Sequence, residues 1–248
     1  MIATVNAPPE QRPPRSEHVR ADYTQMAEDY DRRRFSGRNG EFLARADEAI
    51  VRDLVEQSGA SLLVDVPVGT ARVASYLRGL DVKLVGCDLT WAMLQCAASR
   101  KEVLQMDLVQ ADAAALPLAN ESVDCVISLR FFHLIPYDRR MPFTAEFARV
   151  LKPGGHVICS FTNGWYAGGL NWFRKMTGRN TLTFMQRNEV RRLFPGFKVS
   201  AIRGNFLPLQ YLTSHLGHGA ERFGLRLNGR FPLNRLCYER FYLLQKGV

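Results

Sequence analysis

Leu62-Leu63-Val64-Asp65-Val66-Pro67-Val68-Gly69-Thr70-Ala71-Arg72 has the pattern of a buried strand, a tight turn and the start of a helix. The apolar run 62–66 is short and rich in valine and leucine, as in a strand that is covered on both faces. Pro67 removes a backbone donor, and Gly69 permits a backbone conformation that other residues disfavour. Open α/β sheets bind ligands at such turns, where strands end and helices begin.

An acidic residue ends the next predicted strand, which spans 82–88. Asp88 follows the glycine turn by about 20 residues, the spacing at which an acid accepts a hydrogen bond from a bound ribose. A pyrophosphate would need the pattern G-x-G-x-x-G, but Pro67 stands at the first glycine position. The sequence therefore predicts a nucleoside-containing cofactor that is not a dinucleotide.

Four motifs in order resemble class I S-adenosylmethionine-dependent methyltransferases. Asp65-x-Pro67-x-Gly69-x-Ala71 is similar to the family's acid-x-Gly-x-Gly-x-Gly turn, although Pro67 and Ala71 replace two of its three glycines. The others are Asp112-Ala113-Ala114-Ala115-Leu116-Pro117, Val123-Asp124-Cys125-Val126 and Leu151-Lys152-Pro153-Gly154-Gly155. In the last motif, proline stops a helix and the two glycines turn the chain into a strand.

The resemblance implies a Rossmann-like α/β fold: a seven-stranded, doubly wound, mostly parallel sheet with helices on both faces and an antiparallel last strand. It divides the chain into a disordered leader (1–16), an N-terminal helical cap (17–60), a cofactor-binding core (61–161) and a basic substrate lid with the last strands (162–248).

The resemblance also implies S-adenosyl-L-methionine as the cofactor and assigns residues to it. Asp88 would bind the ribose, Leu89 and Met93 would pack on the adenine, and Asp112 with the Ala113 amide would read the adenine edge. Asp65, Pro67 and Gly69 form the turn below the cofactor. Tyr23 and Tyr30, in a predicted amphipathic helix, are candidates to cover it, with packing inside the helical cap as the alternative.

The tip of the predicted fourth strand, residues 129–134, would face both the methyl donor and the acceptor. Arg130 is a candidate contact to the cofactor or an acidic substrate and, with His133, a candidate catalytic residue. The unperturbed pKa of a histidine side chain lies near neutrality, so His133 is a candidate general base. Simple packing beside Phe131 and Phe132 is the alternative. The tip lacks the Asn/Asp-Pro-Pro-Tyr/Phe motif of enzymes that methylate nucleobase amino groups.

Charge is distributed unevenly along the chain. Residues 161–248 hold 14 Lys and Arg but only 3 Asp and Glu, whereas residues 1–160 hold 19 and 21. Such asymmetry favours an acidic partner or a membrane surface. Nucleic acid is disfavoured because no recognition motif accompanies the charge.

The five cysteines form no Cys-x-x-Cys pair, which predicts reduced thiols and no metal site. Reduced thiols favour a cytoplasmic location. The protein would be peripheral at a membrane if the basic segment binds one. His215 and His218 lack further ligands at suitable spacing.

Two classes of acceptor follow. The core resembles enzymes that methylate oxygen, nitrogen or carbon of small aromatic or lipid-like molecules. The alternative is a lysine of an acidic protein partner, held by the basic residues. A non-catalytic cofactor-binding module is a third interpretation, because Pro67 and Ala71 alter the first motif.

Overall fold

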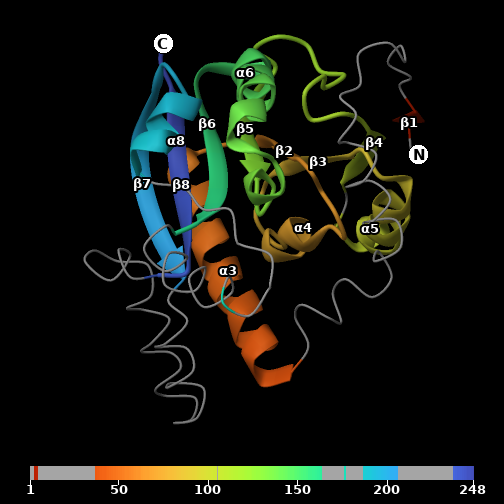
Figure 1. Ribbon diagram of the computed structural model, residues 1–248. Coiled ribbons are helices and arrows are strands. Elements are labelled where there is room, and N and C mark those ends of the chain that lie inside the picture. The colour runs from red at the N-terminus through yellow and green to blue at the C-terminus, as the bar shows by residue number, and fades with distance from the viewer. Residues whose placement is uncertain (1–2, 5–36, 105, 164–175, 177–186, 206–236) are drawn as a thin grey trace.

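The computed structural model describes residues 3–4, 37–104, 106–163, 176, 187–205 and 237–248. Within these ranges the chain forms one eight-stranded sheet in the order β1-β4-β3-β2-β5-β6-β8-β7 (Figure 1). All neighbouring strands are parallel except β8, which is antiparallel to β6 and β7. The strands are β1 (Ala3–Thr4), β2 (Leu62–Asp65), β3 (Lys83–Asp88), β4 (Asp107–Gln110), β5 (Val123–Ser128), β6 (Leu151–Thr162), β7 (Phe197–Asn205) and β8 (Glu239–Lys246).

Helices cover both faces of the sheet because strand residues alternate between two apolar cores. Leu63, Ile127 and Leu243 pack with α3 (Gly37–Ser58), α4 (Arg72–Tyr76) and α5 (Trp91–Leu104). Val64 and Val126 point to the opposite face, with α6 (Met141–Val150) and α8 (Arg187–Leu193). This alternation is the two-residue period of a strand. The expected doubly wound α/β fold with an antiparallel last strand is therefore confirmed.

The structure differs from the expectation at three boundaries. An eighth strand, Ala3–Thr4, pairs with Val109 and Gln110 at the edge of the sheet, inside the segment expected to be a leader. The sequence pattern also predicts a strand over 103–110 and a helix over 138–150. The strand begins only at Asp107, because α5 continues to Leu104. The helix begins at Met141, after the short 3-10 helix η3 (Tyr137–Arg139).

The Lys-Pro-Gly-Gly sequence forms a bulge rather than a separate turn. Helix α6 ends at Val150 and β6 begins at once, since Leu151 pairs with Val123. The next pair is Cys125 with His156, so the four residues 152–155 of β6 stand opposite the single residue Asp124 of β5. A Cβ on Gly155 would lie 2.9 Å from the carbonyl oxygen of Lys152. The second glycine is therefore required by close backbone approach.

Candidate functional site

The turn after β2 is fixed by hydrogen bonds to β3. The Val68 amide donates to the Cys87 carbonyl at 2.7 Å, and the Gly69 amide donates to Asp88 Oδ2 at 2.9 Å. Gly69 has φ +52°, so its role as a residue in the left-handed region, expected from the sequence, is confirmed. Ala71 is also left-handed, at φ +59°, and leads into the short helix α4. Ala71 stands at the third glycine position of the acid-x-Gly-x-Gly-x-Gly turn, and it keeps the left-handed backbone that glycine adopts readily. Pro67 is half-buried in the same turn.

Gly86 in the middle of β3 allows the turn to pack so closely. A Cβ built on Gly86 would lie 2.7 Å from Val68 Cγ2 and 3.0 Å from Leu108 Cδ2. Real Cβ atoms essentially never show a contact as short as 2.7 Å, and a contact of 3.0 Å is tighter than most. The absence of a side chain at position 86 therefore sets the position of Val68 and, through it, of Gly69. A glycine inside a predicted strand is the signal that could have identified this residue.

The Asp88 carboxylate closes the turn from the β3 side. Its Oδ2 accepts from Gly69 and its Oδ1 accepts from the Thr90 amide at 2.8 Å. The side chain is almost fully buried, and this burial raises the pKa of Asp88 to about 6, against the lowering effect of the two amide hydrogen bonds. An ionised carboxylate is a hydrogen-bond acceptor, so Asp88 suits a ribose hydroxyl as the donor.

Asp65, at the end of β2, has a buried oxygen with no partner. The residue is 1% exposed, and its Oδ2 makes no hydrogen bond. Burial, and next the neighbouring charge of Asp88, raise the pKa of Asp65 well above its ordinary range. An unpaired buried carboxylate is costly, and a cationic or hydrogen-bond-donating ligand would relieve that cost. Asp65 thus fits an ammonium group at the carboxyl end of β2.

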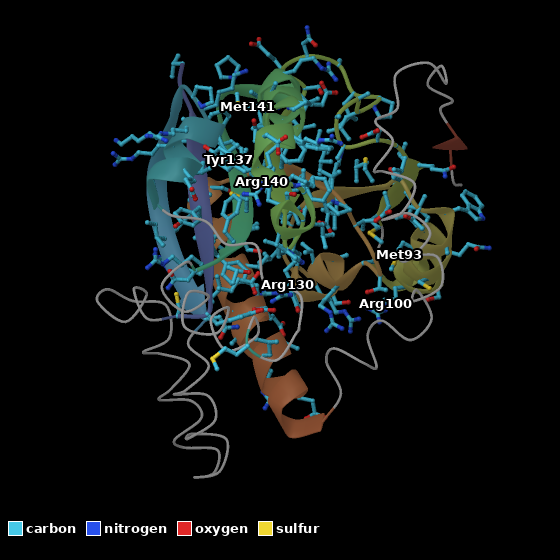
Figure 2. All side chains as sticks on the ribbon, viewed as in Figure 1. Met93, Arg100, Arg130, Tyr137, Arg140 and Met141 are labelled. Atoms are coloured by element: carbon cyan, nitrogen blue, oxygen red, sulfur yellow. The ribbon has the colours of Figure 1, made fainter. Side chains whose placement is uncertain are left out.

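The residues expected around the adenine lie on the two loops that follow β3 and β4. The Ala111 amide donates to the Asp88 carbonyl at 3.0 Å, which ties the ends of these strands together. Met93, on the first turns of α5, is buried, and Leu89 is half-buried (Figure 2). Asp112 Oδ1 accepts from the Ala114 amide at 2.9 Å. This hydrogen bond fixes the turn that contains both Asp112 and the Ala113 amide.

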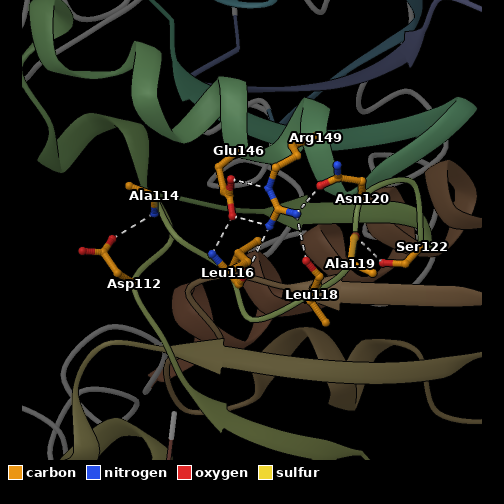
Figure 3. A network of polar contacts seen from close by, with 9 residues as sticks. All are labelled: Asp112, Ala114, Leu116, Leu118, Ala119, Asn120, Ser122, Glu146 and Arg149. Carbon is orange, nitrogen blue, oxygen red and sulfur yellow. Dashed lines mark hydrogen bonds and ion pairs between the residues drawn. The ribbon is translucent and has the colours of Figure 1, made fainter. Parts of the chain in front are cut away.

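A polar network that the sequence did not suggest holds this loop against α6 (Figure 3). Glu146 Oε1 accepts from the Leu116 amide at 2.6 Å and pairs with Arg149 at 2.7 Å. Arg149 also donates to the carbonyls of Leu116 at 3.0 Å and Leu118 at 2.9 Å. Glu146 and Arg149 are therefore positioning residues for the loop that begins at Asp112. The spacing of a glutamate and an arginine three apart on one helix face was the available signal.

The tip after β5 contains both expected catalytic candidates, in different settings. His133 is half-buried in the 3-10 helix η2 (Phe132–Leu134), which leaves the carboxyl end of β5. Arg130 instead points toward α3 and forms ion pairs with Asp47 and Glu239. Two carboxylates already hold its guanidinium, so the expected contact of Arg130 to cofactor or substrate lacks support from this geometry. Its role there stays a prediction.

Some expected residues lie outside the described ranges: Tyr23, Tyr30, His215, His218 and most of the basic segment 161–248. Within the described ranges no group of three or more metal-binding side chains occurs. Within the described ranges none of the five cysteines forms a disulfide, and four of them are buried. None of the described helices is long and apolar enough to cross a membrane.

Comparison with known proteins agrees with this geometry. Residues 64–159 match a family described as a methyltransferase domain. Phthiotriol/phenolphthiotriol dimycocerosates methyltransferase of Mycobacterium leprae (strain TN) is 39% identical over 105 residues, which is 42% of this chain and 38% of that protein. The ubiquinone/menaquinone biosynthesis C-methyltransferase of Syntrophotalea carbinolica is 34% identical over 114 residues, 44% of this chain and 47% of its own length. The similarity thus spans less than half of either relative.

The fold as a whole is shared with a solved structure. Magnesium protoporphyrin IX methyltransferase from Synechocystis PCC 6803, crystallised with bound S-adenosylhomocysteine (SAH), superposes with a TM-score of 0.67 at 17% identity. The match covers 94% of this chain and 99% of the other. At this identity the likeness establishes a common architecture.

Proposed function

Because the chain belongs to the class I S-adenosylmethionine-dependent methyltransferase superfamily, we propose that it transfers a methyl group from S-adenosyl-L-methionine to a small aromatic or lipid-like acceptor. The observation that carries the cofactor part is the end of β2: a turn whose Gly69 amide is held by Asp88, beside a buried Asp65 oxygen without a partner. This arrangement offers groups for each polar part of the cofactor.

The residues present fit that cofactor by the chemistry of their donors and acceptors. The carboxylate of Asp65 suits the ammonium of the methionine part, and that of Asp88 suits the ribose hydroxyls. Asp112 accepts from an exocyclic amine while the Ala113 amide donates to a ring nitrogen. Met93 and Leu89 supply apolar surface for a planar base.

When bound, the cofactor supplies a methyl group already activated by a positive sulfur, for in-line displacement by an acceptor oxygen, nitrogen or carbon. The chain's own contribution is then to orient the acceptor and to exclude water. His133 would take the proton of an acceptor that has to lose one, because its segment leaves the carboxyl end of β5. In the same segment, Phe131 packs against Phe143 of α6, and their ring centroids lie 5.1 Å apart.

The class of acceptor is supported by the relatives. One of them is named for a lipid of the dimycocerosate type and another for quinone biosynthesis. Both names are consistent with an apolar acceptor. The 14 basic residues between 161 and 248 support a contact with an anionic membrane surface, where such an acceptor would reside.

Methylation of a lysine in an acidic protein is the second candidate, and the same basic excess favours it. A lysine acceptor needs a desolvating channel that keeps its amine neutral. From the sequence, the aromatic residues at 131–132 and 165–173 are the candidates for such a channel. Phe132 is fully buried and packs against Phe147, Phe161 and Phe194. Phe132 is thus a core residue, which weakens this candidate.

Label transfer separates the two candidates. Purified protein is incubated with methyl-tritiated S-adenosylmethionine and a host extract that lacks the endogenous enzyme, and the extract is then divided into protein, solvent-soluble and nucleic-acid fractions. Label in the solvent-soluble fraction is expected. Label in one discrete protein band would replace the small-molecule proposal with the protein one, and saturable cofactor binding with no label in any fraction would favour a non-catalytic module.

A further inference from the structure

Three buried polar residues, Asp47, Asn205 and Glu239, meet the partly exposed Arg130 at the end of β5, and we call these four residues the Arg130 cluster. They come from α3, the tip of β5, the end of β7 and the start of β8. Arg130 Nε donates to Glu239 Oε2 at 3.1 Å, and its Nη2 pairs with both Glu239 and Asp47. Asn205 Nδ2 donates to Asp47 Oδ1 at 2.9 Å. The cluster therefore joins segments more than 150 residues apart in sequence, as the Asn205–Asp47 bond shows.

Arg130 has a strained backbone as well as a paired side chain. Its φ is +54°, in the left-handed region that costs an ordinary residue free energy. Its amide donates to Ser160 Oγ of β6 at 2.9 Å. Such strain persists only where surrounding contacts enforce it. The side-chain pairs and the Ser160 contact are the contacts that enforce it here.

The negative charges of Asp47 and Glu239 stabilise the positive charge of Arg130. Burial opposes its charge, but the nearby charges of Asp47 and next Glu239 outweigh that effect, and they raise the pKa of Arg130. Burial raises the pKa of Asp47, and Arg130 counteracts this shift. The charges of Asp47 and Arg130 also act on the pKa of Tyr76 in α4: Asp47 raises it and Arg130 lowers it. The helix that follows the Gly69 turn therefore faces the cluster. Removing the arginine would leave two buried carboxylates without their cation.

The ends of β6 and β7 and the start of β8 also meet beside the cluster. The Asn163 amide donates to the Tyr238 carbonyl at 2.8 Å, and the Tyr238 amide donates to the Asn205 carbonyl at 2.9 Å, directly before β8 begins. Asn163 Nδ2 donates to the Cys237 carbonyl at 2.8 Å. The end of β6, the end of β7 and the start of β8 are therefore fixed to each other beside Glu239.

We propose that Arg130 is a positioning residue for the proposed methyl transfer: the Arg130 cluster holds the β5 tip in its left-handed conformation and so sets the place of His133, three residues on. Arg130 then acts through the tip and does not contact the acceptor. This inference rests on the proposed function for its catalytic consequence, whereas the conformational part stands on the structure alone. Neither Asp47 nor Glu239 belongs to any of the four methyltransferase motifs.

A matched pair of arginine variants tests the proposal. Arg130→Met removes the cluster's cation. Arg203→Met is the control, because Arg203 also forms an ion pair with α3, to Asp53 at 2.7 Å, but donates its other hydrogen bond to the Ile202 carbonyl and not to a member of the Arg130 cluster. We expect Arg130→Met to lower the turnover number at least tenfold, to change the dissociation constant of SAH less than threefold, and to speed amide hydrogen exchange at residues 129–133. Arg203→Met should leave all three quantities unchanged.

Two milder variants keep the proposal testable if Arg130→Met does not fold. Glu239→Gln keeps the Asp47–Arg130 pair and should show the same pattern with smaller changes. Arg130→Lys keeps the charge without the planar fork and should restore part of the turnover lost in Arg130→Met. If Arg130 and Arg203 variants behave alike, or if exchange at 129–133 stays at the wild-type rate, the proposal is overturned. If the wild type neither binds SAH nor transfers label, the proposed function fails, and the exchange measurement still decides whether the cluster holds the tip.

Discussion

Gly86→Ala is expected to destabilise the protein by forcing the Gly69 turn away from β3. The added Cβ would lie 2.7 Å from Val68 Cγ2, 3.0 Å from Leu108 Cδ2 and 3.1 Å from Val68 Cβ. Overpacking of this kind costs about 1–3 kcal/mol. The entropic gain of replacing a strand glycine returns roughly 0.5–1 kcal/mol. We expect a net loss of about 1–2 kcal/mol in the free energy of unfolding, measured by urea denaturation.

A double-mutant cycle that combines Gly86→Ala with Val68→Ala tests the steric argument. Alone, Val68→Ala should cost about 1–3 kcal/mol, because Val68 is buried. In the double variant the new Cβ at position 86 enters the space that the valine methyls leave. The 2.7 Å contact with Val68 Cγ2 is then gone, while the contacts of 3.0 Å with Leu108 and 3.1 Å with the Cβ at position 68 remain. The double variant should therefore lose less stability than the sum of the two single variants, with a coupling energy of at least about 1 kcal/mol. Additive effects within about 0.5 kcal/mol, or a Gly86→Ala protein as stable as wild type, would refute the steric argument.

Three other predictions concern the site. Because the pKa of Asp88 is raised to about 6, its ionised form is lost below that pH, so the affinity for SAH should fall about tenfold per pH unit below 6. The same shift implies that the unliganded fold loses up to about 3 kcal/mol of stability as pH rises from about 4 to 6, and Asp88→Asn should abolish this step in a denaturation series. Arg149→Ala removes donors to the carbonyls of Leu116 and Leu118, and should lower stability by about 1–2 kcal/mol and SAH affinity about fivefold, whereas the exposed Arg139→Ala should change neither. His133→Ala should lower turnover about 10²-fold if the histidine is the general base, and unchanged turnover would return it to a packing role.

Local patterns predicted the parts of the site that lie close together in sequence. The Gly69 turn and Asp88 are 19 residues apart, and the strand, turn and strand between them form one unit whose spacing the chain itself reveals. The loop beginning at Asp112 was equally visible, because its residues follow one another. In these cases the hydrogen-bonded partners belong to adjacent elements.

Long-range partners escaped the sequence for a physical reason. Glu146 reaches Leu116 across 30 residues, and Glu239 reaches Arg130 across 109. Such pairs depend on which strands become neighbours in the sheet. One local sign was present: Asp47 falls on the same helix face as Ile50 and Leu54, and a carboxylate on an apolar face implies a buried partner.

Titration of the purified protein with SAH tests most directly whether the carboxyl ends of β2 to β5 form a cofactor site. The account predicts saturable binding at one site per chain by calorimetry, weakened at least tenfold in a folded Asp88→Ala variant that has lost the ribose contact. Absence of saturable binding to the wild type would contradict the cofactor assignment. Near-normal affinity in Asp88→Ala would show that the ribose lies elsewhere.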